Sequence, residues 1–156
     1  MTINFYDTRL KDDKTTVLIK ERAVEYDTEI KTDNPKDIAG LMWRVLEMDK
    51  LAEEYCYMIV MNNACKILGL FFLSKGTVSL GVISAREIYM RALLIGGSMI
   101  ILIHNHPSGR AEPTRIDIET SIKIKDVGDL MGIPLIDHII IGDHDYYSFK
   151  ENNLLQ

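Results

Sequence analysis

The sequence predicts a mixed α and β fold, in which helices pack on a curved, mixed β-sheet. Short apolar runs that are typical of buried strands are interspersed with segments whose apolar residues recur at helical spacing. Strands and helices alternate too rarely for a doubly wound parallel sheet. A chain of 156 residues can bury one core of ordinary size. We therefore expect a single compact α+β domain.

The N-terminal part of the chain predicts strands followed by one helix. Residues 1–14 are polar and are expected to be loosely held. Residues 15–26 are rich in β-branched side chains with partial alternation, which predicts one or two strands. Between residues 33 and 54, Asn34 or Asp33 can cap a helix, Pro35 suits its first turn, and the apolar residues that follow share one face. This segment predicts an amphipathic helix.

The rest of the chain predicts most of the sheet and two more helices. Short apolar or β-branched runs bounded by turn residues predict strands at residues 55–62, 66–76, 77–84, 98–104, 134–142 and 146–151. One helix is predicted from Ser84, a plausible cap, to a glycine pair at 96–97. The last helix is predicted at 113–132, where it opens with Pro-Thr and closes at a glycine.

Charge and composition limit the classes of function. The chain has 18 Lys and Arg against 23 Asp and Glu, a net charge of -5, and its basic residues are scattered, whereas nucleic-acid binders usually carry a basic stripe. Cys56 and Cys65 form no CxxC pair, so a reducing compartment is expected. The N-terminus lacks an apolar signal core, and the apolar run at 92–103 is too short to span a bilayer. We expect a cytoplasmic protein with no membrane association.

Two of the four histidines, His104 and His106, stand where a buried run breaks into a loop. If the strand continues to His106, both imidazoles point to the same side, and Pro107 then ends the strand because it has no N–H to donate. Two converging imidazoles are suitable ligands for zinc. Asp117 lies eleven positions after His106, in the first turn of the last predicted helix. It would face back toward the strand end, so it is the candidate third ligand.

These and other polar residues also have readings without chemistry. Thr114 and Asp117 fit a capping box, in which both residues only stabilise the start of a helix. On a strand, Asp137 and His138 face opposite sides. His138 could support the metal site from behind, but we favour a structural role for this isolated histidine. His144 lies between two aspartates and is expected in a solvated turn.

The stretch HNHPSGRAEPTRID, residues 104–117, resembles the JAMM (MPN+) metalloprotease motif, and it matches the RadC-like branch of that family most closely. KGTVSLGVISAREIYMRAL, LIDHIIIG and YYSFKE resemble further stretches of the branch in the same order. The resemblance covers about Leu51 to Leu155. It implies a JAMM/MPN (cytidine-deaminase-like) domain at residues 51–156, with residues 1–50 as a strand and helix extension packed on the core.

The resemblance implies a zinc site held by His104, His106 and Asp117, with water as the fourth ligand. Zinc lowers the pKa of a bound water toward about 7 and polarises a substrate carbonyl. The implied reaction is hydrolysis of an amide or isopeptide bond in a peptide or protein substrate.

The family pattern also implies a glutamate just before an early central strand. Glu54 fits that place better than its neighbour Glu53, and it would act as the general base. Thr114 or Ser108 could donate a hydrogen bond to the developing oxyanion, and the resemblance points to Thr114. Glu87 is interpreted as structural, at a helix N-terminus.

The sequence departs from the family pattern at Ser84-Ala85, where RadC-like proteins usually have His-Pro. Two other functions stay open. RadC-like proteins are often labelled as DNA-repair factors, but the sequence supports this function only weakly, because its net charge is acidic and it has no basic stripe. The chain could also be an inactive scaffold that binds protein partners, but its intact ligand set argues against this. The substrate and the oligomeric state, a homodimer among the options, stay open too.

Overall fold

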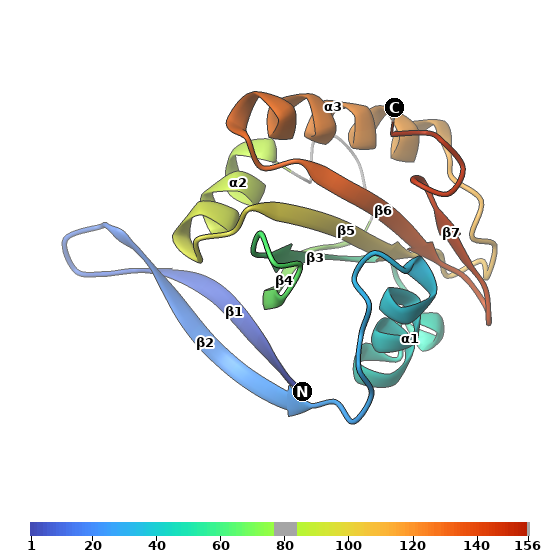
Figure 1. The fold of residues 1–156 in the computed structure, drawn as a ribbon, viewed down its shortest axis with the longest axis horizontal. Helices are drawn as coiled ribbons and strands as arrows, with labels where there is room; N and C mark the ends of the chain where they lie inside the picture. Colours follow the sequence, from blue (N-terminus) through green and yellow to red (C-terminus); the bar gives the residue numbers. More distant parts are fainter. Residues whose placement is uncertain (77–83, 156) are drawn as a thin grey trace.

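The computed structural model describes residues 1–76 and 84–155. Its elements are β1 (Thr2–Leu10), β2 (Thr16–Glu25), α1 (Pro35–Leu46), the short 3-10 helix η1 (Met48–Lys50), β3 (Tyr55–Met61), β4 (Ile67–Lys75), α2 (Ala85–Leu94), β5 (Met99–Asn105), α3 (Arg115–Met131), β6 (Leu135–Ile141) and β7 (Tyr146–Ser148). Figure 1 shows that the strands form one sheet and that the helices pack around it.

The described strands form one mixed sheet in the order β2-β1-β4-β3-β5-β6-β7. The pairs β1–β4 and β5–β6 are parallel, and the other neighbours are antiparallel. One apolar cluster joins α1 to one face of the sheet, and a second joins α2 and α3 to the opposite face (Figure 1). The predicted α+β fold, a mixed sheet flanked by helices, is confirmed.

Alternation along β5 decides which side chains reach which face. Ile101 and Ile103 pack in the cluster with α1, whereas Leu102 packs in the cluster with α2 and α3. Since successive side chains of a strand point to opposite faces, His104 lies on the α2 and α3 face and Asn105 on the other. The end of β5 therefore presents different chemistry on each side of the sheet.

The predicted helix at 33–54 is too long, because α1 ends at Leu46. Its start is as expected: the Asn34 side chain accepts a hydrogen bond from the Lys36 N–H at 3.1 Å, and Pro35 occupies the first turn. The backbone of Glu47 is left-handed, with φ of 47°, and its N–H donates to carbonyls of the last turn. A non-glycine residue in this conformation leaves no local signal that a helix ends there.

Residues 1–14 are not loosely held, which corrects the expectation from their polarity. β1 pairs with β2 from Thr2 to Leu10, and it pairs with β4 at Phe5 and Tyr6. Ile3 and Phe5 are buried in the cluster with α1. The stability of β1 comes from pairing with distant segments, so local polarity misjudged it. The predicted strand at 77–84 lies outside the described residues except for Ser84, and the predicted last strand ends early, at Ser148.

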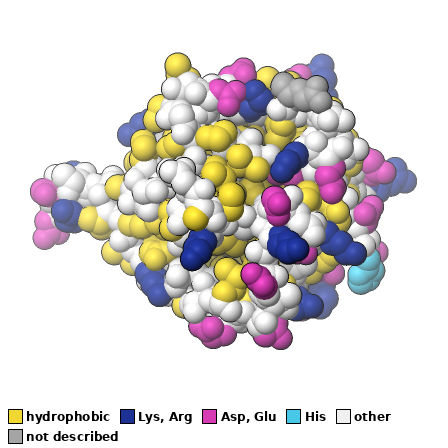
Figure 2. All heavy atoms as spheres, viewed as in Figure 1, with side chains coloured by type: hydrophobic (Ala, Val, Ile, Leu, Met, Phe, Trp, Pro, Cys, Tyr) yellow, Lys and Arg dark blue, Asp and Glu magenta, His cyan; other side chains and the backbone are white. Residues whose placement is uncertain are grey.

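The surface agrees with the scattered charge of the sequence. On the face drawn in Figure 2, basic and acidic side chains stand among one another, and no basic stripe crosses it. Among the described helices, none combines the length and the apolar character needed to cross a membrane.

Candidate metal centre

The end of β5 brings two imidazoles together on the α3 side of the sheet. β5 ends at Asn105, one residue beyond the predicted strand at 98–104, and the His106 N–H still donates to the Ile141 carbonyl at 2.9 Å. Backbone pairing with β6 therefore continues to His106, and both rings keep the same face. The Nε2 atoms of His104 and His106 are 3.0 Å apart. The predicted convergence of the two histidines is confirmed.

The start of α3 adds Asp117 to the pair. Its Oδ1 lies 3.3 Å from the His104 Nε2, and its Oδ2 lies 3.4 Å from the His106 Nε2. The Thr114 N–H and hydroxyl both donate to Asp117 Oδ2 at 2.7 Å, and the Asp117 N–H donates to the Thr114 hydroxyl oxygen at 3.2 Å. The capping box is thus present, and it holds the carboxylate beside the imidazoles. Asp117 therefore belongs to both the cap and the cluster.

The hydrogen bond of His106 determines which of its ring nitrogens is free. Its Nδ1 lies 2.8 Å from the Arg110 carbonyl oxygen, which can only accept a hydrogen bond. A neutral His106 therefore carries its proton on Nδ1, so the lone pair on Nε2 faces His104 and Asp117.

A chain of three hydrogen bonds orients His104 in the same way. The Ser121 hydroxyl donates to the Asp117 carbonyl oxygen at 2.6 Å, so it accepts from Nδ1 of His138, also at 2.6 Å. Nε2 of a neutral His138 then accepts from Nδ1 of His104 at 2.8 Å. The Nε2 of His104 is left with a lone pair that faces the other two ligands.

The contact between His138 and His104 corrects the preference for a purely packing role. His138 lies on β6, beside β5, and its buried ring directly contacts a candidate ligand. Ser121 was not anticipated at all. Its position four residues after Asp117 places both side chains on one face of α3, which is the only signal in the sequence that links them.

The electrostatics of the cluster favour a cation. Burial alone would raise the pKa of Asp117, but the hydrogen bonds that His104 and His106 donate to it when their Nε2 atoms are protonated bring this pKa well below its usual range. Burial alone would lower the pKa of His106, but the bonds with Asp117 and the Arg110 carbonyl raise it. Burial, with a smaller contribution from His104, holds the pKa of His138 well below its usual value, so this ring is neutral.

Two lone pairs and a carboxylate that converge on one point repel each other unless a cation lies between them. His104, His106 and Asp117 each offer a ligand atom, and these atoms lie within 4.8 Å of one another. Ligands about 2.0 to 2.1 Å from a tetrahedral zinc ion stand roughly 3.3 Å apart. The separations of 3.0, 3.3 and 3.4 Å in the cluster fit that spacing. The three residues could therefore hold a metal ion of this kind.

The register of the sheet separates Glu54 from Glu53. β3 pairs antiparallel with β5, with Cys56 opposite His104, so the same register places residue 54 opposite His106. Glu54 therefore falls on the face of the ligands, and its negative charge helps to raise the pKa of His106. The Glu53 side chain is exposed and forms an ion pair with Lys75 at 2.6 Å.

The two predicted hydroxyl groups lie beside the cluster. Ser108, Thr114 and His106 line a cavity of about 520 Å³ together with Arg110 and Glu112. Both hydroxyl residues are exposed, and the Arg110 N–H donates weakly to the Ser108 hydroxyl at 3.4 Å. Of the three candidate ligands, His106 lines this cavity.

The remaining polar residues of interest lie outside the cluster. Asp137 is buried on the opposite side of β6 from His138, where its carboxylate accepts hydrogen bonds from the Ser148 hydroxyl and the Lys150 N–H. His144 is exposed in the loop before β7, as expected. Glu87 lies in the first turn of α2, as expected for a structural acid.

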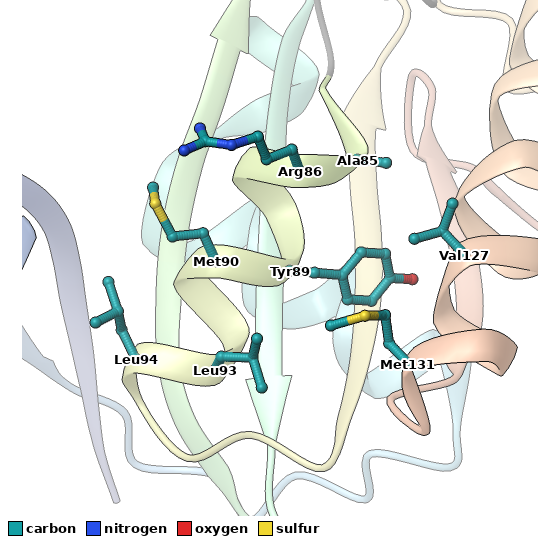
Figure 3. Close-up of a pocket in the computed structure, with 8 residues that line it drawn as sticks. All are labelled: Ala85, Arg86, Tyr89, Met90, Leu93, Leu94, Val127 and Met131. Atoms are coloured by element: carbon teal, nitrogen blue, oxygen red, sulfur yellow. The ribbon is translucent and has the colours of Figure 1, made fainter.

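An apolar groove lies away from the cluster, between α2 and the C-terminal end of α3 (Figure 3). It has a volume of about 530 Å³, and Tyr89 of α2 lies toward Val127 and Met131 of α3. Met131 is fourteen residues beyond Asp117, or about 21 Å along the helix. None of its described lining residues is a His, Cys, Asp or Glu, so the groove lacks metal-binding side chains.

Comparison with known proteins agrees with the geometry. A family model described as a RadC-like JAB domain matches residues 32–154. A UPF0758 protein of Clostridium beijerinckii is 38% identical over 127 residues, which make up 81% of this chain and 55% of that protein. UPF0758 proteins of Staphylococcus haemolyticus and Clostridium perfringens are each 36% identical, over 83% and 88% of this chain and 56% and 60% of theirs. The chain therefore spans little more than half the length of these relatives.

Proposed function

Since the chain belongs to the RadC-like JAB domain family, we propose that it is a zinc-dependent hydrolase that cleaves an amide or isopeptide bond in a peptide or protein. The observation that carries the proposal is the convergence of two Nε2 lone pairs with the Asp117 carboxylate. This donor set of two imidazoles and one carboxylate suits a catalytic zinc site, which keeps one position open.

His104, His106 and Asp117 would hold the zinc ion. Zinc supplies Lewis-acid polarisation of the substrate carbonyl and makes a water molecule acidic enough to attack near neutral pH. Glu54 takes a proton from the attacking water and passes it to the leaving amine, because it lies on the ligand face opposite His106.

Ser108 and Thr114 are the two candidates for the hydrogen bond to the developing oxyanion. Thr114 already donates its hydroxyl proton to Asp117 at 2.7 Å, so its loss would disturb the ligand as well as the substrate. The residue whose replacement by alanine lowers kcat when the variant is compared with the wild type at equal zinc occupancy is the oxyanion donor. Ser108→Ala and Thr114→Ala, measured side by side, distinguish the two.

Metal content tests the site first. The protein, purified without chelator and then offered zinc, is expected to hold about one zinc ion per chain by mass spectrometry. His104→Ala and Asp117→Ala should lose it, whereas His144→Ala, in an exposed loop, should keep it. A wild-type protein that stays free of zinc would contradict the catalytic proposal and favour a scaffold that binds protein partners.

Hydrolysis tests the reaction next. The zinc-loaded protein is incubated with a peptide mixture and with isopeptide-linked lysine substrates, and the products are identified by mass spectrometry. Glu54→Gln should lower the rate of cleavage about 10²- to 10⁴-fold while zinc stays bound. Glu53→Gln, which changes the neighbouring exposed acid, should cleave like the wild type. Equal activity of the Glu54→Gln variant and the wild type would show that the general base was assigned wrongly.

A further inference from the structure

Asn105 stands between the two candidate histidine ligands, but its side chain points to the other face of the sheet. It is buried, with 1% of its surface exposed, and its amide has two backbone partners. The Tyr55 N–H donates to Asn105 Oδ1 at 2.7 Å, and Asn105 Nδ2 donates to the Glu53 carbonyl at 3.0 Å. These two bonds enclose residue 54 from both sides.

The end of β5 explains why a side chain takes over from the backbone here. Pro107 closes the strand, so β5 offers no further regular ladder to the segment that enters β3. The primary amide of Asn105 carries one acceptor and one donor on a short arm, the same pair of groups that a peptide unit would offer. It therefore extends the pairing of β5 past Tyr55, the first residue of β3, to the carbonyl of Glu53.

We infer that Asn105 is a positioning residue, which holds Glu54 opposite the candidate metal ligand His106 by fixing the backbone on either side of Glu54. The inference rests on the proposed function, since the general base of that reaction is Glu54. One tripeptide, His104 to His106, then supplies two ligands on one face and a clamp for the base on the other. A third contact completes the clamp, because the Gly76 N–H donates to the Glu54 carbonyl at 2.8 Å.

Amide hydrogen exchange reports the clamp without reference to activity. Asn105→Leu keeps the approximate size of the side chain and removes both polar groups. The amides of Tyr55 and Gly76 should then exchange about tenfold faster or more, while those of Met58 and Ile59 in the middle of β3 keep their wild-type rates. Zinc content should be unchanged, because the side chain faces away from the ligands.

A second variant guards against a fold that does not tolerate leucine. Asn105→Asp keeps an acceptor for the Tyr55 N–H and lacks the donor for the Glu53 carbonyl. It should leave the Tyr55 amide closer to its wild-type protection than Asn105→Leu does. Asn4→Leu changes an asparagine on β1, remote from this strand end, and should alter neither the Tyr55 nor the Gly76 amide.

Kinetics test whether the clamp acts through Glu54. With zinc bound, Asn105→Leu should lower kcat about 10²-fold with little change in KM, as expected for a displaced base. The double variant Asn105→Leu with Glu54→Gln should be no slower than Glu54→Gln alone. Losses that multiply, a parallel loss of zinc, or unchanged exchange at Tyr55 and Gly76 would each overturn the inference.

The two proposals fail in different ways. A wild-type protein that binds zinc but cleaves no amide would overturn the proposed function, and exchange at Tyr55 would still decide whether Asn105 clamps this segment. Cleavage that depends on Glu54 but not on Asn105 would leave the proposed function in place and overturn the inference.

Discussion

At the scale of single residues, the candidate metal centre is organised by hydrogen bonds that leave each donor and acceptor only one role. The carbonyl oxygens of Asp117 and Arg110 can only accept hydrogen bonds. The Arg110 carbonyl fixes the tautomer of His106 directly. The Asp117 carbonyl fixes the tautomer of His104 through the hydrogen bonds of Ser121 and His138. These bonds keep the Nε2 lone pairs of His104 and His106 in the orientation that a bound cation would need. A ligand set prepared in this way spends less free energy on ordering when the metal binds.

Replacing His138 tests this preparation. His138→Phe removes the acceptor for Nδ1 of His104, so zinc affinity should fall about 10- to 100-fold. His138→Gln keeps an acceptor near the position of Nε2 and should restore part of the affinity. Competition with a chromophoric chelator measures both, with His144→Phe in the exposed loop as the control. Wild-type affinity in a folded His138→Phe variant would show that the hydrogen-bond chain has no influence on the metal.

Asp137, on the other side of β6, predicts a pH dependence of stability. Burial raises its folded pKa above its usual 3.8, although the Ser148 hydroxyl and the Lys150 N–H lower it in part. A raised folded pKa means that the stabilising contribution is complete below about pH 3.8 and is lost as pH rises through the folded pKa. In this window, the stability of the wild type relative to Asp137→Asn should fall by at most about 1.4 kcal/mol per pH unit.

Urea denaturation of both proteins at a series of pH values from about 4 to 7 measures that window. Ser148→Ala supplies the control, because it removes the largest interaction that lowers the pKa of Asp137. In Ser148→Ala, the pH range over which the contribution of Asp137 to stability is lost should therefore extend to higher pH. A difference between wild type and Asp137→Asn that is the same at every pH would contradict the prediction.

At the scale of helices and strands, the sequence predicted what local chemistry decides. Polar breaks, alternation and caps located β5, α3 and the convergence of the two histidines, since these depend on neighbouring residues. The sequence alone did not reveal which distant segments pair with one another. β1 lies beside β4, His138 contacts His104, and the Asn105 side chain bonds to the backbone where β3 begins. Each of these contacts joins residues far apart in sequence. Only the register of assembled strands could separate Glu54 from Glu53.

Two helical glycines predict opposite effects of the same substitution. A Cβ at Gly128 in α3 would lie 2.4 Å from the Tyr89 hydroxyl oxygen and 2.7 Å from the Ile133 carbonyl oxygen. A Cβ at Gly40 in α1 would meet nothing closer than the Tyr26 hydroxyl oxygen at 4.0 Å. Gly128→Ala should therefore destabilise the protein by about 1 to 3 kcal/mol. Gly40→Ala should stabilise it by up to about 1 kcal/mol, since alanine favours a helix. Chemical denaturation decides, and shifts of the same sign would contradict the packing of α2 on α3.

At the scale of the whole molecule, the burial of α1 bears on where the N-terminal extension ends and the folded domain begins. The family match begins at residue 32 and so includes α1, whereas the sequence resemblance begins near Leu51. Ile38, Leu41 and Met42 of α1 are fully buried in the cluster that covers the sheet beneath the site. By contrast, within the described part of the chain the β1–β2 hairpin pairs with the remaining strands only at Phe5 and Tyr6, and its far end extends from the body (Figure 1).

Truncation at two positions tests which of these segments the domain needs. A chain that begins at residue 51 loses α1, in which the three large buried side chains of Ile38, Leu41 and Met42 contribute about 5 kcal/mol or more, comparable with the whole stability of an ordinary domain. We expect it to show no cooperative unfolding transition. A chain that begins at residue 32 loses the hairpin but keeps α1 over the sheet, so it should unfold cooperatively at a lower urea concentration than the full chain. Circular dichroism during urea titration distinguishes them. A cooperative transition in the shorter chain would place α1 with the extension and leave residues 51–156 as the folding unit.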